Sequence, residues 1–429
     1  MRNRSERIFV VVLLLVSMHV VSGVLSSTHV NTETSNAIIS TGIHLPSVLS
    51  EMVIYLWCAV LVLPRWKTTW KAVKAAWPIL LLPVLVILSS LWSVNPLLTL
   101  RRSSFFTLST IMAIYLGERF TLEEFAELFA QAECWFIFAT TATYLVYPAK
   151  VLDPSHPGAW RGLTIQKNVF GECMAVAVLL LVLMRFRRHR ALQRIFLCAA
   201  ILMLYLSHSV TPTVCCAVVL VSIPVLRRVC RLRIKERVAA YTFCGTSVVL
   251  GILLVTNYSA SLLPIFGRDS TLSGRAQLWS LVMEAIWKRP ILGYGYEAFW
   301  EGFQGVSRGI LESTGWLVPM AHNGYLEVWL GIGLAGLALV LYLFFRAMRM
   351  ALQLLRQERR LVAAWPIVYL LFFALHNLGE STLLTRTTFE FLVFVQVSVA
   401  LQQARNRERA AVTEGTQKQE VSAESLTPA

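Results

Sequence analysis

The amino-acid sequence predicts an all-α polytopic membrane protein with about twelve transmembrane helices and one large extracytoplasmic loop between spans nine and ten. Of its 429 residues, 56% are hydrophobic and only 15% are charged, whereas an ordinary soluble domain has about 25% charged residues. A soluble fold of this length has too little interior to bury so much apolar surface. The apolar residues also gather in runs of about 17–25 residues, closed by Lys and Arg clusters, as membrane spans do.

The first predicted span follows Arg2, Arg4 and Arg7, as both signal peptides and signal anchors do. Its apolar stretch is long for a signal peptide and lacks a clear A-x-A cleavage site, which favours a retained anchor helix. The apolar runs at 104–117 and 195–208 are short, so we expect tilted or broken helices there. In chain order, the predicted spans are residues 8–25, 45–63, 77–94, 104–117, 127–147, 168–184, 195–208, 211–226, 239–257, 325–345, 361–377 and 388–402.

Lys and Arg residues are distributed unequally over the predicted loops. With a cytoplasmic N-terminus, 28 of the 39 fall on the cytoplasmic side and 11 fall outside. Because cytoplasmic loops retain positive charge, both termini are predicted to be cytoplasmic. Residues 1–404 then form one transmembrane domain, residues 258–324 are its largest outer loop, and residues 405–429 form a polar tail that is expected to be disordered.

Composition also excludes several classes of protein. The net charge of +15 would suggest nucleic-acid binding in a soluble protein, but here most cations lie in loops where membrane topology explains them. The eight Cys residues lie in or beside apolar runs without CxxC spacing, which predicts neither disulfides nor a zinc site. The sequence contains no Walker, GxSxG or HExxH motif and no outer DxD pair, so we predict no metal and no cofactor.

The outer cations are the most informative charged residues, because topology disfavours them there. Eight of the eleven lie in two loops, residues 148–167 and 258–324. The second loop is about 67 residues long and rich in Trp, Gly and Tyr, so we expect it to be ordered and functional. It includes a helical pattern whose apolar face carries Leu278, Trp279, Val282, Ala285 and Ile286.

Arg268 and Arg275 are predicted to lie near the N-terminal end of this helix, which Ser273 is expected to cap. Guanidinium groups beside a helix N-terminus form a site suited to phosphate oxygens. The alternative is that both arginines contact anionic lipid headgroups without specificity. After the helix, the Gly-Tyr-Gly sequence at 293–295 is expected to build a structural turn.

Two further segments carry candidate binding groups. His322 and Asn323 mark the point where the chain re-enters the membrane, and a neutral histidine there is suited to accept a proton from a sugar hydroxyl. The alternative is a histidine that only caps the helix. Lys167 and Asn168 begin the sixth span after Arg161, which predicts another helix end receptive to anions, with a topological anchor as the alternative.

Ionisable residues also occur near the predicted outer membrane boundary. Glu172 lies one turn into the sixth span, and Glu380 follows His376 and Asn377. Ionisable groups inside a membrane are candidate functional residues by default. At boundary depth, simple solvation is an equal alternative, so the sequence leaves both open.

Together these segments resemble the bacterial O-antigen ligase and polysaccharide polymerase superfamily. The resemblance rests on GRDSTLSGRAQLW at 267–279, RPILGYG at 289–295 and HNGYLE at 322–327. Earlier segments that are similar are Arg161-Gly162 with Lys167, Asn168 and Gly171, and WSVNP at 92–96 followed by Arg101-Arg102. The resemblance extends from about residue 77 to 390.

The resemblance implies a metal-independent, inverting glycosyltransferase on the periplasmic face of the bacterial inner membrane. Its donor is a glycan on undecaprenyl pyrophosphate, and its acceptor is a hydroxyl of lipid A-core (ligases) or of another lipid-linked repeat unit (O-antigen or exopolysaccharide polymerases). Membrane lipids surround it. Carried onto this chain, Arg161, Arg268 and Arg275 bind the pyrophosphate, and His322 orients or deprotonates the acceptor hydroxyl.

The remaining predicted substrate-binding residues are Lys167, Asn168, Asn323, Tyr294 and Trp279, and a groove lined by Trp279, Tyr294 and Trp300 is expected to hold sugar rings. One departure weakens the ligase assignment, since Val210 stands where ligases of this superfamily carry an Arg. Two other classes stay open. A lipid-linked oligosaccharide flippase would bind its substrate at mid-membrane, and a non-catalytic assembly subunit would not need His322.

Overall fold

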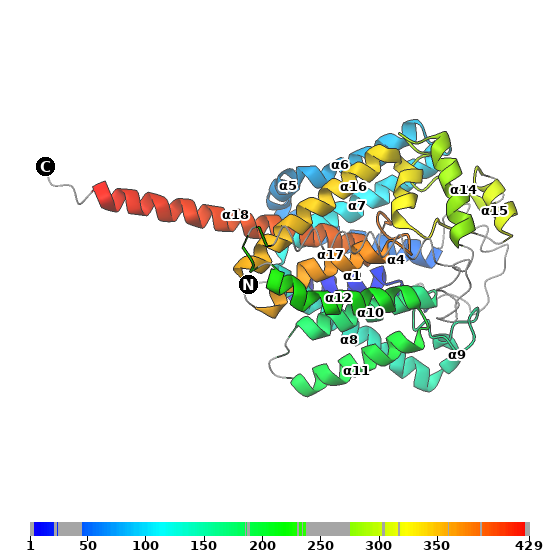
Figure 1. Ribbon diagram of the computed structural model, residues 1–429, viewed down its shortest axis with the longest axis horizontal. Coiled ribbons are helices and arrows are strands. Elements are labelled where there is room, and N and C mark those ends of the chain that lie inside the picture. Colours follow the sequence, from blue (N-terminus) through cyan, green and yellow to red (C-terminus); the bar gives the residue numbers. More distant parts are fainter. Residues whose placement is uncertain are drawn as a thin grey trace.

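Every named secondary-structure element in the described part of the chain is a helix (Figure 1). The computed structural model describes residues 4–20, 24, 45–184, 186, 189–229, 231–233, 235–236, 275–302, 305–315, 318–358, 360–386 and 388–424. The all-α prediction is confirmed for these residues. The predicted ninth span at 239–257 lies outside them, as do Arg268 and Ser273.

The described residues between 4 and 151 form four long helices and several short ones. Asn95 caps the third of the long helices by accepting a hydrogen bond from the Leu98 amide, and a capping box between Thr121 and Glu124 begins the fourth. The elements are α1 (Arg4–Ser17), α4 (Leu45–Val62), η1 (Leu63–Arg65), α5 (Trp66–Ala75), α6 (Trp77–Leu88), η2 (Ser89–Leu91), α7 (Pro96–Arg119), α8 (Leu122–Val146) and α9 (Pro148–Val151).

The described residues from 167 onward include the helices before, within and after the large predicted loop. Asn323 caps the 34-residue helix that begins at Gly324 by accepting from two backbone amides. The elements are α10 (Lys167–Leu183), α11 (Arg190–Leu206), α12 (Val210–Val229), α14 (Arg275–Lys288), α15 (Arg308–Thr314), α16 (Gly324–Gln357), η5 (Leu361–Ala364), α17 (Trp365–His376) and α18 (Phe389–Glu424).

Two expectations about helix length differ from the structure. The run at 104–117 is the middle of α7, a continuous helix of 24 residues, because its Ser and Thr hydroxyls bond to carbonyls of their own helix and do not interrupt it. Residues 405–424, expected to be disordered, continue α18 as helix and project from the bundle (Figure 1). Ala, Arg, Gln and Glu dominate this tail, and all four favour helix.

The described helices include membrane spans. α12 and α16 are each long and apolar enough to cross a membrane. The pair Met52–Ala75 and Trp77–Leu91, bent by 86°, would make a third if it counts as one span. The full number of twelve spans and their orientation stay predictions.

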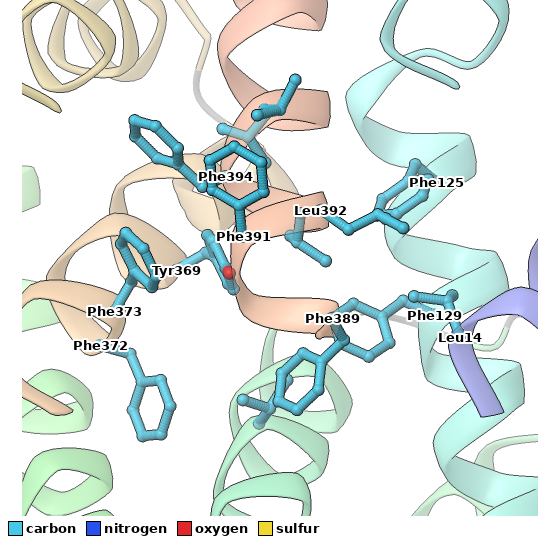
Figure 2. Close-up of a cluster of buried hydrophobic side chains, with 14 of the residues drawn as sticks. Leu14, Phe125, Phe129, Tyr369, Phe372, Phe373, Phe389, Phe391, Leu392 and Phe394 are labelled. Carbon is cyan, nitrogen blue, oxygen red and sulfur yellow. The ribbon is translucent and has the colours of Figure 1, made fainter. Parts of the chain in front are cut away.

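Aromatic side chains fill the centre of the bundle (Figure 2). Phe389 of α18 packs edge-on against Phe129 of α8, with ring centroids 5.8 Å apart. Phe373 of α17 stacks on Phe394 of α18 at 5.4 Å. Burying rings of this size removes large apolar areas from the solvent and fixes α8, α17 and α18 against one another.

A second, smaller apolar cluster joins α14 to the segment after it and to the start of α16. Leu278, Val282 and Ile286 are fully buried in it, and Trp279 and Ala285 pack at its edge, so the predicted apolar face is confirmed. α14 ends at Lys288, two residues before Pro290.

The turn at 293–295 binds directly to a kink in α16. Gly293 and Gly295 have left-handed φ values of 70° and 98°, which confirms the predicted glycine turn. The backbone N–H groups of Tyr294 and Gly295 donate to the carbonyls of Leu330 and Gly331, at 2.9 and 2.8 Å. α16 is able to accept these bonds because it leaves helical geometry at 332–333, where Gly333 has a φ of 71°.

Candidate functional site

The carboxylate of Glu380 is the centre of the candidate site. Asn168 donates from Nδ2 to Glu380 Oε1 at 2.9 Å, and Arg275 Nη2 contacts the same oxygen at 3.1 Å. His322 Nδ1 lies 3.4 Å from Oε2. Ser209 extends the network by donating to Asn168 Oδ1 at 2.9 Å. The carboxylate therefore joins α10, α14, the turn before α12 and the residue two positions before α16.

A rigid turn at 377–382 holds Glu380 in place. The Asn377 side chain accepts from the Thr382 amide at 2.9 Å and donates to the Phe373 carbonyl at 2.9 Å. The Asn377 carbonyl accepts from the Gly324 amide at 2.8 Å, which ties this turn to the start of α16. A Cβ atom at Gly324 would collide with the Asn377 side chain, so the close approach requires glycine.

His322 has a strained backbone. Its φ of 50° is left-handed, a conformation that few residues other than glycine adopt. The next residue fixes it, because the Asn323 amide donates to Ser381 Oγ at 3.0 Å and the Asn323 side chain caps α16. Strain of this kind is concentrated at functional sites, where the surrounding structure enforces it.

The Glu380 side chain remains charged despite its burial. Burial alone would raise its pKa, but the hydrogen bond to His322 and the charges of His376, Arg275 and His322 together lower the pKa below the ordinary value of 4.5. Glu380 is therefore a carboxylate at neutral pH. It is able to orient an imidazole and a guanidinium group at the same time.

The loop that carries Arg161 and Lys167 is ordered around Asp153. Asp153 accepts from the Lys167 amide at 3.0 Å, and Arg161 Nε donates to the Lys150 carbonyl at 3.3 Å. The Arg161 side chain is nearly fully buried, and its Nη2 has no acceptor among the described residues. Burial lowers its pKa, although nearby Asp153 opposes that shift. The described contacts do not link Arg161 directly to Glu380.

The three predicted aromatic residues occupy different places. Trp279 donates to the Ala321 carbonyl at 2.9 Å and so supports the residue before His322. Tyr294 is buried, with its hydroxyl donating to the Ala285 carbonyl at 2.9 Å. Trp300 donates to Glu327 Oε1 at 2.8 Å. Their roles toward a sugar stay predictions.

A second set of buried acids lies among the helices next to the site, and we call Glu133, Glu172 and Glu390 the inner acids. Glu172 Oε1 lies 3.1 Å from His376 Nδ1, and Glu390 is within hydrogen-bonding reach of Glu172. Neither carboxyl oxygen of Glu133 has a hydrogen-bond partner in the described part of the chain. Within that same part, no group of three His, Cys, Asp or Glu residues is placed to hold a metal ion.

The sequence predicted most residues of this site, but from separate motifs. Arg275, His322, Asn168 and Asn323 are brought together, as the motifs predict for residues of one site. Glu380 was left open between function and solvation, and it is the residue that joins them. The signal that favours it is a carboxyl group close to the imidazole of His376 and the amide of Asn377 at a membrane boundary.

Comparison with known proteins confirms the resemblance to the O-antigen ligase and polysaccharide polymerase superfamily. Residues 195–341 match the family described as O-antigen ligase, a stretch that includes Arg275, His322 and Asn323. The chain is also 34% identical, over 127 residues, to the exopolysaccharide production protein ExoQ of Rhizobium meliloti (strain 1021). That similarity covers 28% of this chain and 29% of the relative, so the chain matches less than a third of the relative's length.

Proposed function

We propose that the protein transfers a glycan from undecaprenyl pyrophosphate to a hydroxyl acceptor at the periplasmic face of the bacterial inner membrane. The convergence of Arg275 and His322 on Glu380 is the observation that supports this most directly. One is a cation suited to a phosphate group, and the other is a base suited to a hydroxyl. Both lie within the stretch that matches the O-antigen ligase family.

The proposed step is a direct displacement at the donor sugar. The acceptor oxygen attacks the anomeric carbon, and the bond from that carbon to the pyrophosphate oxygen breaks with its electron pair leaving on the pyrophosphate. His322 takes the acceptor proton on Nε2, because its Nδ1 faces the Glu380 carboxylate at 3.4 Å. Attack from the side opposite the leaving group inverts the anomeric configuration.

Arginine residues are proposed to stabilise the departing pyrophosphate. Arg275 reaches the site through Glu380, and the buried Arg161 retains a hydrogen-bond donor without an acceptor among the residues that the structure describes. With Arg268, they would supply positive charge where negative charge develops in the transition state, which is the role that metal ions have in other transferases. Lys167, Asn168 and Asn323 are proposed to position the donor and acceptor around them.

Polymerisation is the proposed form of the reaction. Val210 begins α12 directly after Ser209, in the position where ligases of the superfamily carry an Arg. The relative with 34% identity is named for exopolysaccharide production. Both observations favour another lipid-linked repeat unit over lipid A-core as acceptor.

The test is to delete the protein in its host and measure undecaprenyl-linked glycans by mass spectrometry. Accumulated single repeat units would support polymerisation, whereas long glycans stranded on the carrier beside bare lipid A-core would indicate a ligase. Re-expressed wild-type protein is expected to restore normal glycans and His322→Ala is not. Normal glycans with His322→Ala would contradict the catalytic role of that residue.

The inner acids favour one second candidate, a transporter of lipid-linked oligosaccharides. Ionisable groups within spans often mark transport pathways. Reconstituted vesicles discriminate the two functions. A transporter would move a fluorescent lipid-linked glycan between leaflets without lengthening it, and Glu172→Gln would slow that movement.

A further inference from the structure

A cavity of about 290 Å³ lies beside the candidate site. It is enclosed by the second turn of α7, the segment after the 293–295 turn, the first turns of α16 and the loop between α17 and α18. Among its lining residues, Pro319 is exposed and Met320 is half-buried. The residues that line it and enter the argument are Arg102, Glu297, Trp300, Glu327, Gly331 and Thr385.

This cavity adjoins the His322 side of the site. Gly324 and Ser381 line it, and Ser381 accepts a hydrogen bond from the Asn323 amide at 3.0 Å. His322 lies near Oε2 of Glu380, whereas Arg275 and Asn168 contact Oε1. A molecule in the cavity would therefore approach from the side of the proposed base rather than from the side of the proposed phosphate-binding groups.

The charges in and around the cavity already compensate one another. Arg386 Nη1 contacts Glu297 Oε2 at 2.5 Å, and Arg102 Nε lies 3.6 Å from the same oxygen. Arg102 also donates from Nη1 to the Glu297 carbonyl. Because these two cations face two carboxyl groups, Glu297 and the lining residue Glu327, the cavity lacks the excess positive charge that a phosphate group requires. This charge balance favours a neutral ligand.

Three polar side chains of the cavity still have donor or acceptor positions that could form hydrogen bonds with the hydroxyl groups of a ligand. Arg102 is 8% exposed, and its Nε finds no hydrogen-bond acceptor within the described ranges. Thr385 donates its hydroxyl hydrogen to the Ser381 carbonyl at 2.8 Å, which leaves the Thr385 oxygen able to accept. The Glu327 oxygens accept from Trp300 Nε1 and the Ala321 amide at 2.8 and 2.7 Å, and each keeps a second lone pair.

These hydrogen bonds also fix the aromatic wall of the cavity. Trp300 is buried at 6% exposure and oriented by Glu327, and its ring packs edge-on against Phe299. Glu297, next to the cavity, has a left-handed φ of 51°, the same kind of strained backbone as His322. A fixed aromatic ring with donors and acceptors around it is suited to a ligand that has both hydroxyl groups and an apolar C–H face.

We propose that this cavity is a subsite for one uncharged, pyranose-sized sugar ring of the acceptor glycan. The proposal rests on the proposed function and names the part of the substrate that this cavity recognises. Trp300 would contact the C–H face of the ring, while Arg102, Glu327 and Thr385 exchange hydrogen bonds with its hydroxyls. The subsite holds the acceptor so that a hydroxyl on a neighbouring position reaches His322.

Gly331→Leu tests this subsite by filling it. A Cβ atom at Gly331 would have no non-local neighbour closer than 3.7 Å, and its φ is not left-handed, so a side chain fits the backbone and extends into the cavity. The matched control is Gly309→Leu in α15, where a Cβ atom meets nothing within 4 Å. In lipid nanodiscs with lipid-linked donor, Gly331→Leu is expected to raise the acceptor KM about tenfold or more and to leave the donor KM unchanged.

A binding measurement without donor separates this proposal from the proposed function. The probe is the free repeat-unit oligosaccharide released from the host's own polysaccharide, observed by saturation-transfer NMR. Wild type and Gly309→Leu are expected to give the signal, and Gly331→Leu is expected to lose it, even if no transfer is ever detected. Equal signals from wild type and Gly331→Leu would overturn the subsite.

A gentler variant guards against misfolding of Gly331→Leu. Thr385→Val keeps the side-chain volume and removes the hydroxyl oxygen, so the acceptor KM is expected to rise about threefold with kcat unchanged. An unchanged KM in this variant, together with unimpaired binding by Gly331→Leu, would exclude a sugar from the cavity. A preference for a phosphorylated oligosaccharide over the neutral one would also contradict the proposal, since the cavity would then recognise charge.

Discussion

Two sets of buried carboxyl groups lie near each other in this protein, and they differ in what compensates them. Glu380 contacts a guanidinium group, an imidazole and an amide from three separate segments. Among the inner acids, Glu172 lies close to Glu390 and contacts the imidazole of His376, whereas the Glu133 carboxyl oxygens have no hydrogen-bond partner in the described residues. Both sets are almost fully buried, so depth does not distinguish them.

The difference indicates two roles for the same functional group. A buried carboxylate with a cation and hydrogen-bond donors stays charged, and it holds its partners in a defined geometry. A buried carboxyl group without a cation lacks such partners and costs several kcal/mol to keep as an anion. Glu380 is therefore suited to organise a reaction, whereas the inner acids have no guanidinium group among their described contacts.

The largest expected effect comes from neutralising Glu380. Glu380→Gln keeps the volume but removes the charge that orients His322 and compensates Arg275. Transfer in nanodiscs is expected to fall roughly 100-fold or more, mainly in kcat. Glu312→Gln, which disrupts the exposed pair with Arg308, is the control and should remain within about twofold of wild type. Full activity of Glu380→Gln would remove the distinction between the two sets of acids.

Replacing Glu133, in contrast, is expected to improve the protein by raising its stability. Its carboxyl oxygens have no partner among the described side chains and backbone, so Glu133→Leu removes a desolvation cost and should raise the free energy of unfolding by about 1–3 kcal/mol. Thermal unfolding in detergent measures this. Glu172→Leu also removes the contact with His376, so it should raise the free energy of unfolding by less than Glu133→Leu does. A loss of stability in Glu133→Leu would mean that this carboxyl group is compensated after all.

The pH dependence of stability sharpens the comparison. Because the pKa of Glu380 is lowered in the folded protein, its pairing stabilises the fold above the ordinary value of 4.5 and this stabilisation is lost as pH falls through the lower, folded value. Glu380→Gln should therefore flatten the decline of the unfolding temperature below about pH 4.5 and change little between pH 5 and 7. If the unfolding temperature of Glu380→Gln fell with acid as steeply as that of wild type, the lowered pKa of Glu380 would be contradicted.

The smallest expected effect concerns Tyr294. Tyr294→Phe removes the hydrogen bond to the Ala285 carbonyl and should cost about 1 kcal/mol of stability without changing the KM of either substrate. Trp279→Phe, which removes the bond to the Ala321 carbonyl next to His322, is expected to lower kcat as well. A raised acceptor KM in Tyr294→Phe would instead support the sequence-based prediction that Tyr294 binds sugar.

Much of the fold was predictable because membrane helices carry their signal locally. Apolar length predicted α4 and α10 closely, and it predicted the start of α16, although that helix continues to Gln357, beyond the predicted end at 345. The apolar face of α14 followed from a period of 3.6 residues. The length of α7 was underestimated, because Arg101, Arg102 and several Ser residues lower the local hydropathy without interrupting the helix. Local hydrogen bonds of the Ser hydroxyls and the pairing of Arg102 with Glu297 compensate for those polar groups.

The site was predictable in parts and not in its arrangement. Arg275, His322 and Asn168 carry local signals, because each lies at a helix start with basic or amide neighbours. Glu380 carries no such signal, since its importance depends on residues that are 58–212 positions away in the chain. The cavity lined by Trp300 and Arg102 cannot be predicted from a local pattern either, because it is formed by the bend in α16 and by the turn at 293–295, which lies far from α7 in the chain.

The backbone pairing of the 293–295 turn with the kink of α16 limits how this protein can be recombined with relatives. Gly333 has no room for a side chain, since its Cβ would collide with the backbone at Ile291 and Leu292. A chimera that imports residues 275–323 alone would place a foreign turn against the native kink, and the two surfaces would not match. The exchangeable unit therefore extends through residue 334, so that loop and helix start are transplanted as one module.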